Sequence, residues 1–329
     1  MSTAGDLGER EIINLLVGTF DRTEAMSIPF GDDVAGVRLP GHRVAILKTD
    51  MLIGSSDIPP GMSLFQAARK AVVMAISDFA SKGVQPTALL VALGLPRDAS
   101  QEDIAAIGRG LNAGAREHGA HVIGGDTSEA SDLILAVMVY GATSQRRLML
   151  RRGARPGDIL AVTGPFGRTG AGFKILLEEM EAPPVLRARL LEAIYLPQAR
   201  LREGLALRRT GAVTAAIDSS DGLAVSLHEL RKMSHTGFTI TDLPLALEAE
   251  EFARLHDLSP ADLALYGGEE YELVLSVRPS GWEAARRAVG RVGGSLMRVG
   301  VVTGDSSIVL QQERGHTDIP YRGWEHFRS

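Results

Sequence analysis

The order of apolar and polar positions along the chain predicts a mixed α/β protein. Short runs rich in Val, Ile, Leu and Ala recur between clusters of Gly, Pro and Asp, and longer amphipathic stretches separate them. We expect strands at residues 44–49, 88–93, 121–123, 133–140, 159–163, 213–217, 238–240, 271–277 and 297–302. We expect helices to begin near Ser63, Gln101, Thr169, Val185 and Gly222.

A polar stretch near the middle of the chain indicates a domain boundary. Residues 151–158, with the sequence RRGARPGD, interrupt the apolar pattern with Arg, Gly and Pro. The chain has 329 residues, which at roughly 100 to 200 residues per domain suggests about two domains. We therefore expect an N-terminal domain over residues 1–152 and a C-terminal domain over residues 153–329.

One predicted helix carries a carboxylate on its apolar face. Ser63 and Gln66 have the spacing of a capping box, and Gly83 suits the left-handed residue that ends a helix. Lys82 in the last turn suits the negative end of the helix dipole. Asp78 shares a face with mostly small residues at spacings of three and four, so we expect it to be buried. Burying an ionised carboxylate is costly unless a cation lies nearby.

Further aspartates follow apolar strands or lie beside Gly, Ser or Thr. The whole set comprises Asp32, Asp33, Asp50, Asp78, Asp126, Asp218 and Asp221. Strand ends are where α/β folds place their sites. Two carboxylates 4 Å apart repel by about 4 kcal/mol at an effective dielectric constant near 20, so their convergence would require divalent cations.

The ligand type and the neighbouring glycines indicate which cation and which substrate. Oxygen ligands without His or Cys favour Mg²⁺, Mn²⁺ or Ca²⁺, and bound Mg²⁺ is usually completed by substrate phosphates. Gly124 and Gly125 would let the backbone approach phosphate oxygens, and N–H groups at Asp221 and Gly222 could hold an anion. Taken singly, an aspartate before Gly is more often a turn residue or a helix cap than a metal ligand. The carboxylate on a helix face favours a metal–nucleotide site.

Composition excludes several other classes of function. The chain has no Cys, which removes thiolate catalysis, disulfides and Cys-type metal sites. A formal net charge of -5 argues against general nucleic-acid binding. No apolar run reaches the roughly 18 residues of a bilayer span, and the acidic start is unlike a secretory signal, so we expect a cytoplasmic protein without membrane association. The chain also contains no phosphate-binding P-loop motif, no HExxH and no GxSxG.

Seven motifs occur in order along the chain: GDD at 31–33, KTDML at 48–52, AVVMAISDFASKG at 71–83, GGDT at 124–127, VTG at 162–164, AIDSSDGL at 216–223 and GGEEYEL at 267–273. Their order resembles that of the thiamine-monophosphate kinase family of the aminoimidazole ribonucleotide synthetase superfamily. The segment YRGWEHF at 321–327 is similar to the aromatic C-terminus of that family. IPPGM at 58–62 resembles its archaeal branch.

The resemblance implies a fold, an assembly and a set of site residues. The fold would be a mixed two-domain α/β fold whose N-terminal sheets pair into a barrel across a homodimer, with ATP between the domains. The implied Mg²⁺ ligands are Asp33, Thr49, Asp50, Asp78, Asp126, Asp218 and Asp221. The implied nucleotide contacts are Gly125, Asp126, Arg151 and Ser220. The implied thiamine contacts are Glu269 and Tyr321, and Asp57 stands near a position where many bacterial members have a substrate-contacting His.

The implied reaction is direct transfer of the γ-phosphoryl group of ATP to thiamine monophosphate. The acceptor phosphate is already ionised, so we expect no general base, and positioning and Mg²⁺ would carry catalysis. Besides Asp57, Lys48 and Arg168 depart from residues common in the family. Two alternatives stay open: another ATP-using member of the superfamily, such as a purine-pathway synthetase, and a non-catalytic dimer that binds Mg²⁺ and nucleotide.

Overall fold

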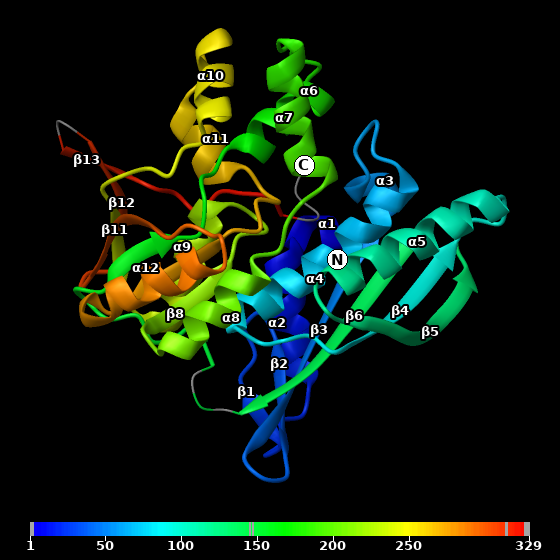
Figure 1. The fold of residues 1–329 in the computed structure, drawn as a ribbon, viewed down its shortest axis with the longest axis horizontal. Helices are drawn as coiled ribbons and strands as arrows, with labels where there is room; N and C mark the ends of the chain where they lie inside the picture. The colour runs from blue at the N-terminus through cyan, green and yellow to red at the C-terminus, as the bar shows by residue number, and fades with distance from the viewer. Residues whose placement is uncertain (1–2, 145, 147, 313–314, 326–329) are drawn as a thin grey trace.

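The chain folds into two sheets with helices packed on and between them (Figure 1). The computed structural model describes residues 3–144, 146, 148–312 and 315–325. The first sheet is mixed, because β4 and β5 are parallel while its other neighbours are antiparallel. Its strands, in spatial order, are β1 Met26–Ile28, β2 Ala35–Leu39, β3 Arg43–Ile53, β6 Ile134–Ser144, β4 Ala88–Leu95 and β5 His121–Glu129.

The second sheet is built from the C-terminal half of the chain. It is also mixed, because β9 and β12 pair in parallel. Its strands, in spatial order, are β13 Gly315–Asp318, β12 Ile308–Gln312, β9 Gly237–Ile240, β11 Met297–Thr303, β7 Ile159–Val162, β10 Leu273–Val277 and β8 Val213–Asp218. The connection between the two sheets runs from the end of β6 to the start of β7 and contains the polar stretch at 151–158. The expected division at residues 152 and 153 stays a prediction within this connection.

The helices have three locations. α4 and α5 lie in the first half, α8, α9 and α12 accompany the second sheet, and α6, α7, α10 and α11 pack together as a separate layer (Figure 1). No helix in the described part of the chain is long and apolar enough to cross a membrane. Their bounds are α1 Ala4–Leu7, α2 Glu9–Thr19, α3 Gly54–Asp57, α4 Leu64–Lys82, α5 Gln101–Glu117, α6 Arg168–Leu177, α7 Pro184–Tyr195, α8 Leu201–Thr210, α9 Leu223–Ser234, α10 Leu247–Leu255, α11 Pro260–Tyr266 and α12 Trp282–Arg291.

Every predicted strand overlaps an observed strand, and the predicted helix starts agree with α4, α5, α6, α7 and α9. The pattern missed the helices α1, α2, α3, α8, α10, α11 and α12 and the strands β1, β2, β12 and β13, although Trp282, Ala285 and Val289 in α12 do have helical spacing. It also stopped β5 at residue 123, whereas the strand continues to Glu129. The extension contains Gly-Gly-Asp, which has low strand propensity, and pairing with β4 overrides that preference.

Helix α4 is the centre of the molecule, and its local signals are confirmed. The Ser63 side chain accepts from the Gln66 N–H while Gln66 accepts from the Ser63 N–H, and Gly83 is left-handed with φ 63°. From Ala67 to Lys82 every residue except Met74 is buried. α4 contacts α5, β3 and β6 on one side and α8 and β8 on the other. One apolar core therefore runs from the first sheet through α4 into the second.

The packing of α5 on α4 gives a matched pair of tests in one helix. A Cβ at Gly110 would lie 2.8 Å from the Cβ of Ala68 and overlap the backbone of Phe65, whereas a Cβ at Gly108 would meet nothing within 4 Å. We predict that Gly110→Ala lowers the free energy of unfolding by about 2 kcal/mol through overpacking. Gly108→Ala should raise it by about 0.5–1 kcal/mol through helix propensity. Urea unfolding of both variants is the measurement, and a stabilising Gly110→Ala would contradict this packing.

Candidate active site

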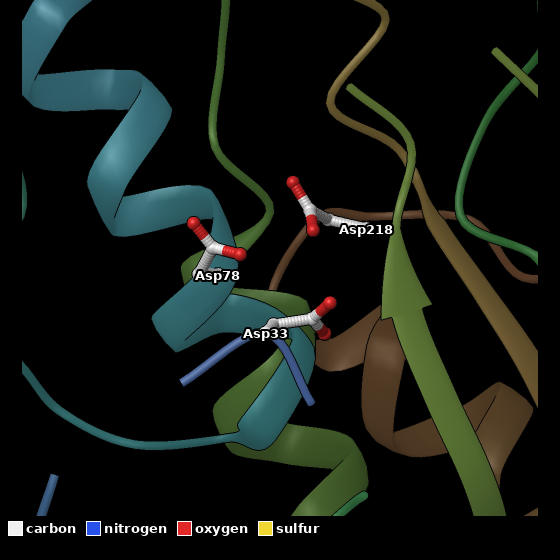
Figure 2. A group of neighbouring side chains, drawn as sticks. All are labelled: Asp33, Asp78 and Asp218. Carbon is white, nitrogen blue, oxygen red and sulfur yellow. The ribbon is translucent and has the colours of Figure 1, made fainter. Parts of the chain in front are cut away.

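Three aspartates from distant parts of the chain meet at the boundary between the two sheets. Asp33, Asp78 and Asp218 each place a carboxylate oxygen within 4.8 Å of the others. Figure 2 shows them converging from the loop before β2, from α4 and from the end of β8. Their exposed fractions are 4%, 6% and 6%. We call these three residues the acidic cluster.

Local structure explains why each carboxylate points to this place. Asp78 lies on a buried turn of α4 that faces β8. Asp218 is the last residue of β8, and its Oδ2 accepts a 2.7 Å hydrogen bond from the Ser77 hydroxyl of α4. Asp33 follows Gly31, whose φ of 97° turns the chain back toward α4. The expected burial of Asp78 is confirmed.

Buried cations of the protein itself compensate part of this negative charge. The Lys82 ammonium lies 2.7 Å from oxygens of both Asp32 and Asp33 and donates to the Ala216 carbonyl at 3.0 Å. The Arg151 guanidinium also pairs with Asp33. The sequence analysis predicted divalent cations beside the aspartates, and it did not predict these two cationic side chains. The helix-end interpretation of Lys82 is incomplete as well, because the ammonium bridges two carboxylates outside its own helix.

The protonation behaviour of the cluster is uneven because two cations pair with Asp33, one pairs with Asp78 and none in the described residues pairs with Asp218. Burial favours a neutral Asp33, but Arg151 and Lys82 outweigh it and lower its pKa to about 2. Burial, with the Asp33 charge, raises the pKa of Asp218 to about 6. Burial raises the pKa of Asp78 well above its usual range despite Lys48. Asp78 and Asp218 thus form the under-compensated side of the acidic cluster.

The donor set of this side fits a hard divalent cation. Carboxylate oxygens from two or three segments, with no imidazole or thiolate in the cluster, are typical of Mg²⁺ or Mn²⁺. The fully buried hydroxyl of Ser219, next to Asp218, has no hydrogen-bond partner in the described residues.

The other predicted ligands lie outside the acidic cluster. Asp50 approaches it indirectly, because Lys48 contacts both Asp50 and Asp78. Thr49 projects from the opposite face of β3, since strand residues alternate. Asp126 lies on the exposed edge strand β5. Burial, with the Glu9 charge, raises the pKa of Asp221 to about 6. The ligand roles of all four stay predictions.

The predicted nucleotide contacts are also spread over several elements. Gly125 lies on β5, so close to the Val91 backbone that no side chain would fit. Arg151 contacts Asp33, and its backbone N–H donates to Asp32 at 3.0 Å. The Ser220 carbonyl accepts from the Glu269 N–H, which joins the two loops beside the acidic cluster. These roles remain predictions too.

A cavity of about 530 Å³ lies between the two halves of the chain. Its wall includes two of the predicted substrate residues, Asp57 and Glu269. The Asp57 carboxylate is engaged locally, because it accepts from the Ile53 N–H at 2.7 Å and from the Ser56 hydroxyl at 3.0 Å. Glu269 therefore supplies the carboxylate in this wall that has an unpartnered oxygen.

Glu269 is held by strained backbone and by a buried lysine that sequence reasoning missed. Glu269 and Tyr271 have φ values of 63° and 52°, which side-chain-bearing residues seldom adopt. The Lys70 ammonium on α4 lies 2.5 Å from Glu269 Oε1 and donates to the Asp57 carbonyl at 3.0 Å. Burial raises the pKa of Glu269 although Lys70 opposes the shift.

The aromatic wall of the cavity differs from the prediction. Tyr321 is absent from the lining, because its ring lies 3.6 Å from the Arg10 guanidinium carbon and packs edge-on against His228. Phe173, Tyr266 and Trp324 line the cavity instead. Trp324 belongs to the same C-terminal segment as Tyr321, of which residues 326 and 327 lie outside the described residues. The substrate role of Tyr321 stays a prediction.

One helix connects the cavity to the acidic cluster. Lys70 and Asp78 are eight residues apart on α4, which corresponds to about 12 Å along the helix axis. The site therefore has an acidic, metal-suited end and an aromatic end with a buried carboxylate. A substrate with a phosphate at one end and an organic cation at the other matches both ends.

Comparison with known proteins identifies the family of the chain. Residues 31–143 match the family described as AIR synthase related protein, N-terminal domain, and residues 155–313 match AIR synthase related protein, C-terminal domain. The chain is therefore a two-domain protein of the AIR synthase related class. Within that class it belongs to the thiamine-monophosphate kinase family, as its similarity to the following relatives shows.

Three relatives named thiamine-monophosphate kinase illustrate the similarity. The Nitrosopumilus maritimus protein is 34% identical over 86% of this chain and 89% of its own length. The Pyrococcus horikoshii protein is 32% identical over 97% of this chain and 96% of its own length. The Escherichia coli protein is 30% identical over 95% and 97% respectively.

Solved structures share the whole fold. The structure described as "AaThiL complexed with AMPPCP and TMP" superposes with a TM-score of 0.86 at 25% identity and covers 99% of both chains. The protein tt0281 from Thermus thermophilus gives a TM-score of 0.85 at 32% identity, over 96% of this chain and 99% of its own. The predicted two-domain fold is confirmed, whereas the barrel across a dimer stays a prediction.

The raised pKa of Asp218 gives a test in metal-free protein. A carboxylate whose folded pKa lies near 6, above its ordinary 3.8, favours folding below pH 4, and that contribution is lost as the pH rises through 6. The contribution to the free energy of unfolding that is lost is up to about 3 kcal/mol. In EDTA, Asp218→Asn should therefore gain stability relative to wild type between pH 4 and pH 8. Urea unfolding at several pH values is the measurement, with exposed Asp98→Asn as control. Parallel curves for wild type and Asp218→Asn would refute the assignment.

Proposed function

We propose that the protein transfers the γ-phosphoryl group of ATP to thiamine monophosphate, giving thiamine diphosphate and ADP. The observation that carries this proposal is the pairing of a buried acidic cluster with an aromatic cavity that contains the buried Glu269 carboxylate. The family membership and the relative described as complexed with AMPPCP and TMP support it.

The chemistry requires positioning and charge neutralisation. A phosphate oxygen of thiamine monophosphate forms a bond to the γ-phosphorus while the bond from that phosphorus to the β,γ-bridging oxygen breaks, and ADP leaves. The attacking oxygen is already ionised, so no proton has to be removed. Mg²⁺ held by Asp78 and Asp218, with Asp33 nearby, would neutralise phosphate charge. Further predicted metal contacts are Thr49, Asp50, Asp126 and Asp221.

The cationic residues fix the ligands of this site. Lys82 and Arg151 keep Asp33 ionised and immobile, so its carboxylate does not have to be desolvated or ordered when substrates bind. We infer that Arg151, Gly125 and Ser220 contact the nucleotide. In this proposal these three residues lie next to the acidic cluster, on the side where the phosphates of the nucleotide bind.

The cavity would hold the organic part of the acceptor. The thiazolium ring carries a positive charge, which Glu269 attracts and which Tyr266 and Trp324 can face through their π-systems. Asp57 contributes through its backbone carbonyl, which holds Lys70 beside Glu269. The resulting wall excludes water from one end of the substrate.

We also propose that the protein is a homodimer that buries the outer face of the first sheet. On the face of β3 turned away from α4, Met51 is 53% exposed, and across the sheet Leu90 of β4 is 38% exposed. Met138 of β6 pairs with Thr49 and Leu90, Tyr140 pairs with Leu47 and Ala88, and both β6 side chains are only half-buried. A contiguous apolar face of this kind is typical of a protein interface.

The kinase proposal predicts a Mg²⁺-dependent reaction that needs Asp78. Purified protein with Mg²⁺, ATP and thiamine monophosphate should form thiamine diphosphate and ADP in equal amounts, and EDTA should stop it. Asp78→Asn should lower kcat/KM by about 100-fold or more, because one preorganised charge at the phosphates is lost. Its circular dichroism spectrum should be unchanged. Failure to form thiamine diphosphate at saturating Mg²⁺ would overturn the proposal, and full activity of Asp78→Asn would overturn the ligand assignment.

The dimer proposal predicts a specific effect of charge on the sheet face. Leu90→Glu should convert the dimer to a monomer in sedimentation equilibrium, because a carboxylate would be buried in an apolar interface. Leu247→Glu is the matched control, since Leu247 lies on α10 and is 78% exposed. A monomeric wild type, or a dimer that survives Leu90→Glu, would argue against this interface.

A further inference from the structure

Lys48 lies among the predicted metal ligands, although a lysine ammonium is not itself a metal ligand. It projects from the inner face of β3, and its ammonium lies 2.9 Å from Asp78 Oδ2 and 3.2 Å from Asp50 Oδ1. The Lys48 side chain is 23% exposed, and those of Asp50 and Asp78 are 25% and 9% exposed. The ammonium is therefore a largely enclosed cation that bridges two carboxylates from two different elements.

The alternation of side chains along β3 fixes this arrangement. Lys48 and Asp50 are two residues apart and pair in register with Val139 and Val137 of β6, which are fully buried beneath α4. Both side chains must therefore face α4, where Asp78 lies. The lysine stem is confined between the sheet and the helix, so the ammonium has little freedom to leave the two carboxylates.

The carboxylates in and beside the acidic cluster differ in how far nearby cationic side chains compensate their charge. Asp33 is neutralised by Lys82 and Arg151 from one side. Lys48 compensates part of the charge of the Asp50 and Asp78 pair from the other. Asp218 has only the Ser77 hydroxyl as a side-chain partner of its carboxylate among the described residues. The space beside Asp218 and Asp78 is thus left for an added cation, whereas the space between Asp50 and Asp78 already contains one.

We propose that Lys48 is a built-in cation that occupies the position a divalent ion would otherwise take between Asp50 and Asp78. The chain then binds one divalent ion fewer than its set of carboxylates would allow, and its metal binds on the Asp218 side of Asp78. The inference rests on the proposed Mg²⁺ site but not on the identity of the phosphate acceptor. It assigns Asp50 to the internal ion pair and removes it from the metal ligands.

The test is the number of Mn²⁺ ions bound per chain, measured by the electron paramagnetic resonance signal of free Mn²⁺ during titration of the full chain. Lys48→Met keeps most of the length of the side chain and removes its charge, and it should bind one ion more than wild type. Lys48→Arg retains the charge and should bind the same number as wild type. Lys232→Met removes the charge of an exposed lysine and should change nothing.

A second substitution locates the additional ion. In the Lys48→Met background, Asp50→Asn should return the number of bound ions to the wild-type value, because the ion between Asp50 and Asp78 loses a ligand. Equal numbers of ions in wild type and Lys48→Met would overturn the proposal, as would an additional ion that survives Asp50→Asn. If Lys48→Met unfolds in EDTA, Mn²⁺ should refold it, and a protein that stays unfolded in Mn²⁺ would also overturn the proposal.

The same titration separates this inference from the proposed function. A wild type that binds no Mn²⁺ while Lys48→Met binds one ion would contradict the proposed Mg²⁺ site but support the role of Lys48. A wild type that binds Mn²⁺ and transfers phosphate, with no additional ion in Lys48→Met, would support the function and refute the role of Lys48.

Discussion

The buried ionic contacts of α4 are the constraint on which the rest of the structure depends. α4 lies between the two sheets, and three of its charged residues, Lys70, Asp78 and Lys82, are almost fully buried. A buried charge without a partner costs several kcal/mol, so each must face an opposite charge on another element. Lys70 pairs with Glu269 of the second half, and Lys82 pairs with Asp32 and Asp33 of the first. These pairs fix the position of α4 relative to both sheets.

This constraint also organises the functional site. Because Lys70 and Asp78 belong to one rigid helix, the aromatic cavity and the acidic cluster keep a constant separation. The cations that hold Asp33 and Asp50 in place order the site before any substrate arrives, which is the condition for electrostatic catalysis. The negative charges of Asp78 and Asp218 are only partly compensated by the protein, so their pKa values are raised and a metal ion can bind beside them.

The sequence predicted the elements better than their contacts. Asp78 and Asp218 were found because each breaks a local pattern, one on an apolar helix face and one after an apolar strand. Lys70 was missed because nothing within its own helix distinguishes it, and its partner Glu269 is 199 residues away. Lys82 was interpreted from its place at a helix end, whereas its contacts come from another strand and loop. The periodicity of apolar residues predicts which face of a helix or strand is buried. It does not predict which charged side chain of another element contacts that face.

The aromatic residues of the C-terminal segment and the neighbouring residues of β3 show a second limit of prediction from sequence. Tyr321 was chosen from a short aromatic segment, and the turn of that segment decides that Trp324 faces the cavity while Tyr321 stacks against Arg10. Thr49 and Asp50 are neighbours in sequence, yet the alternation of β3 places them on opposite faces of the first sheet. The family resemblance supplied the order of motifs, and only the assembled sheets show which side chains of each motif meet.

The most direct test of the central claim is anomalous diffraction from crystals grown with Mn²⁺ and a non-hydrolysable ATP analogue. The account predicts Mn²⁺ bound to oxygens of Asp78 and Asp218, with the Lys82 and Arg151 contacts to Asp33 retained. Mn²⁺ found only away from these two carboxylates, or an Asp33 that abandons both cations to bind the metal, would contradict it.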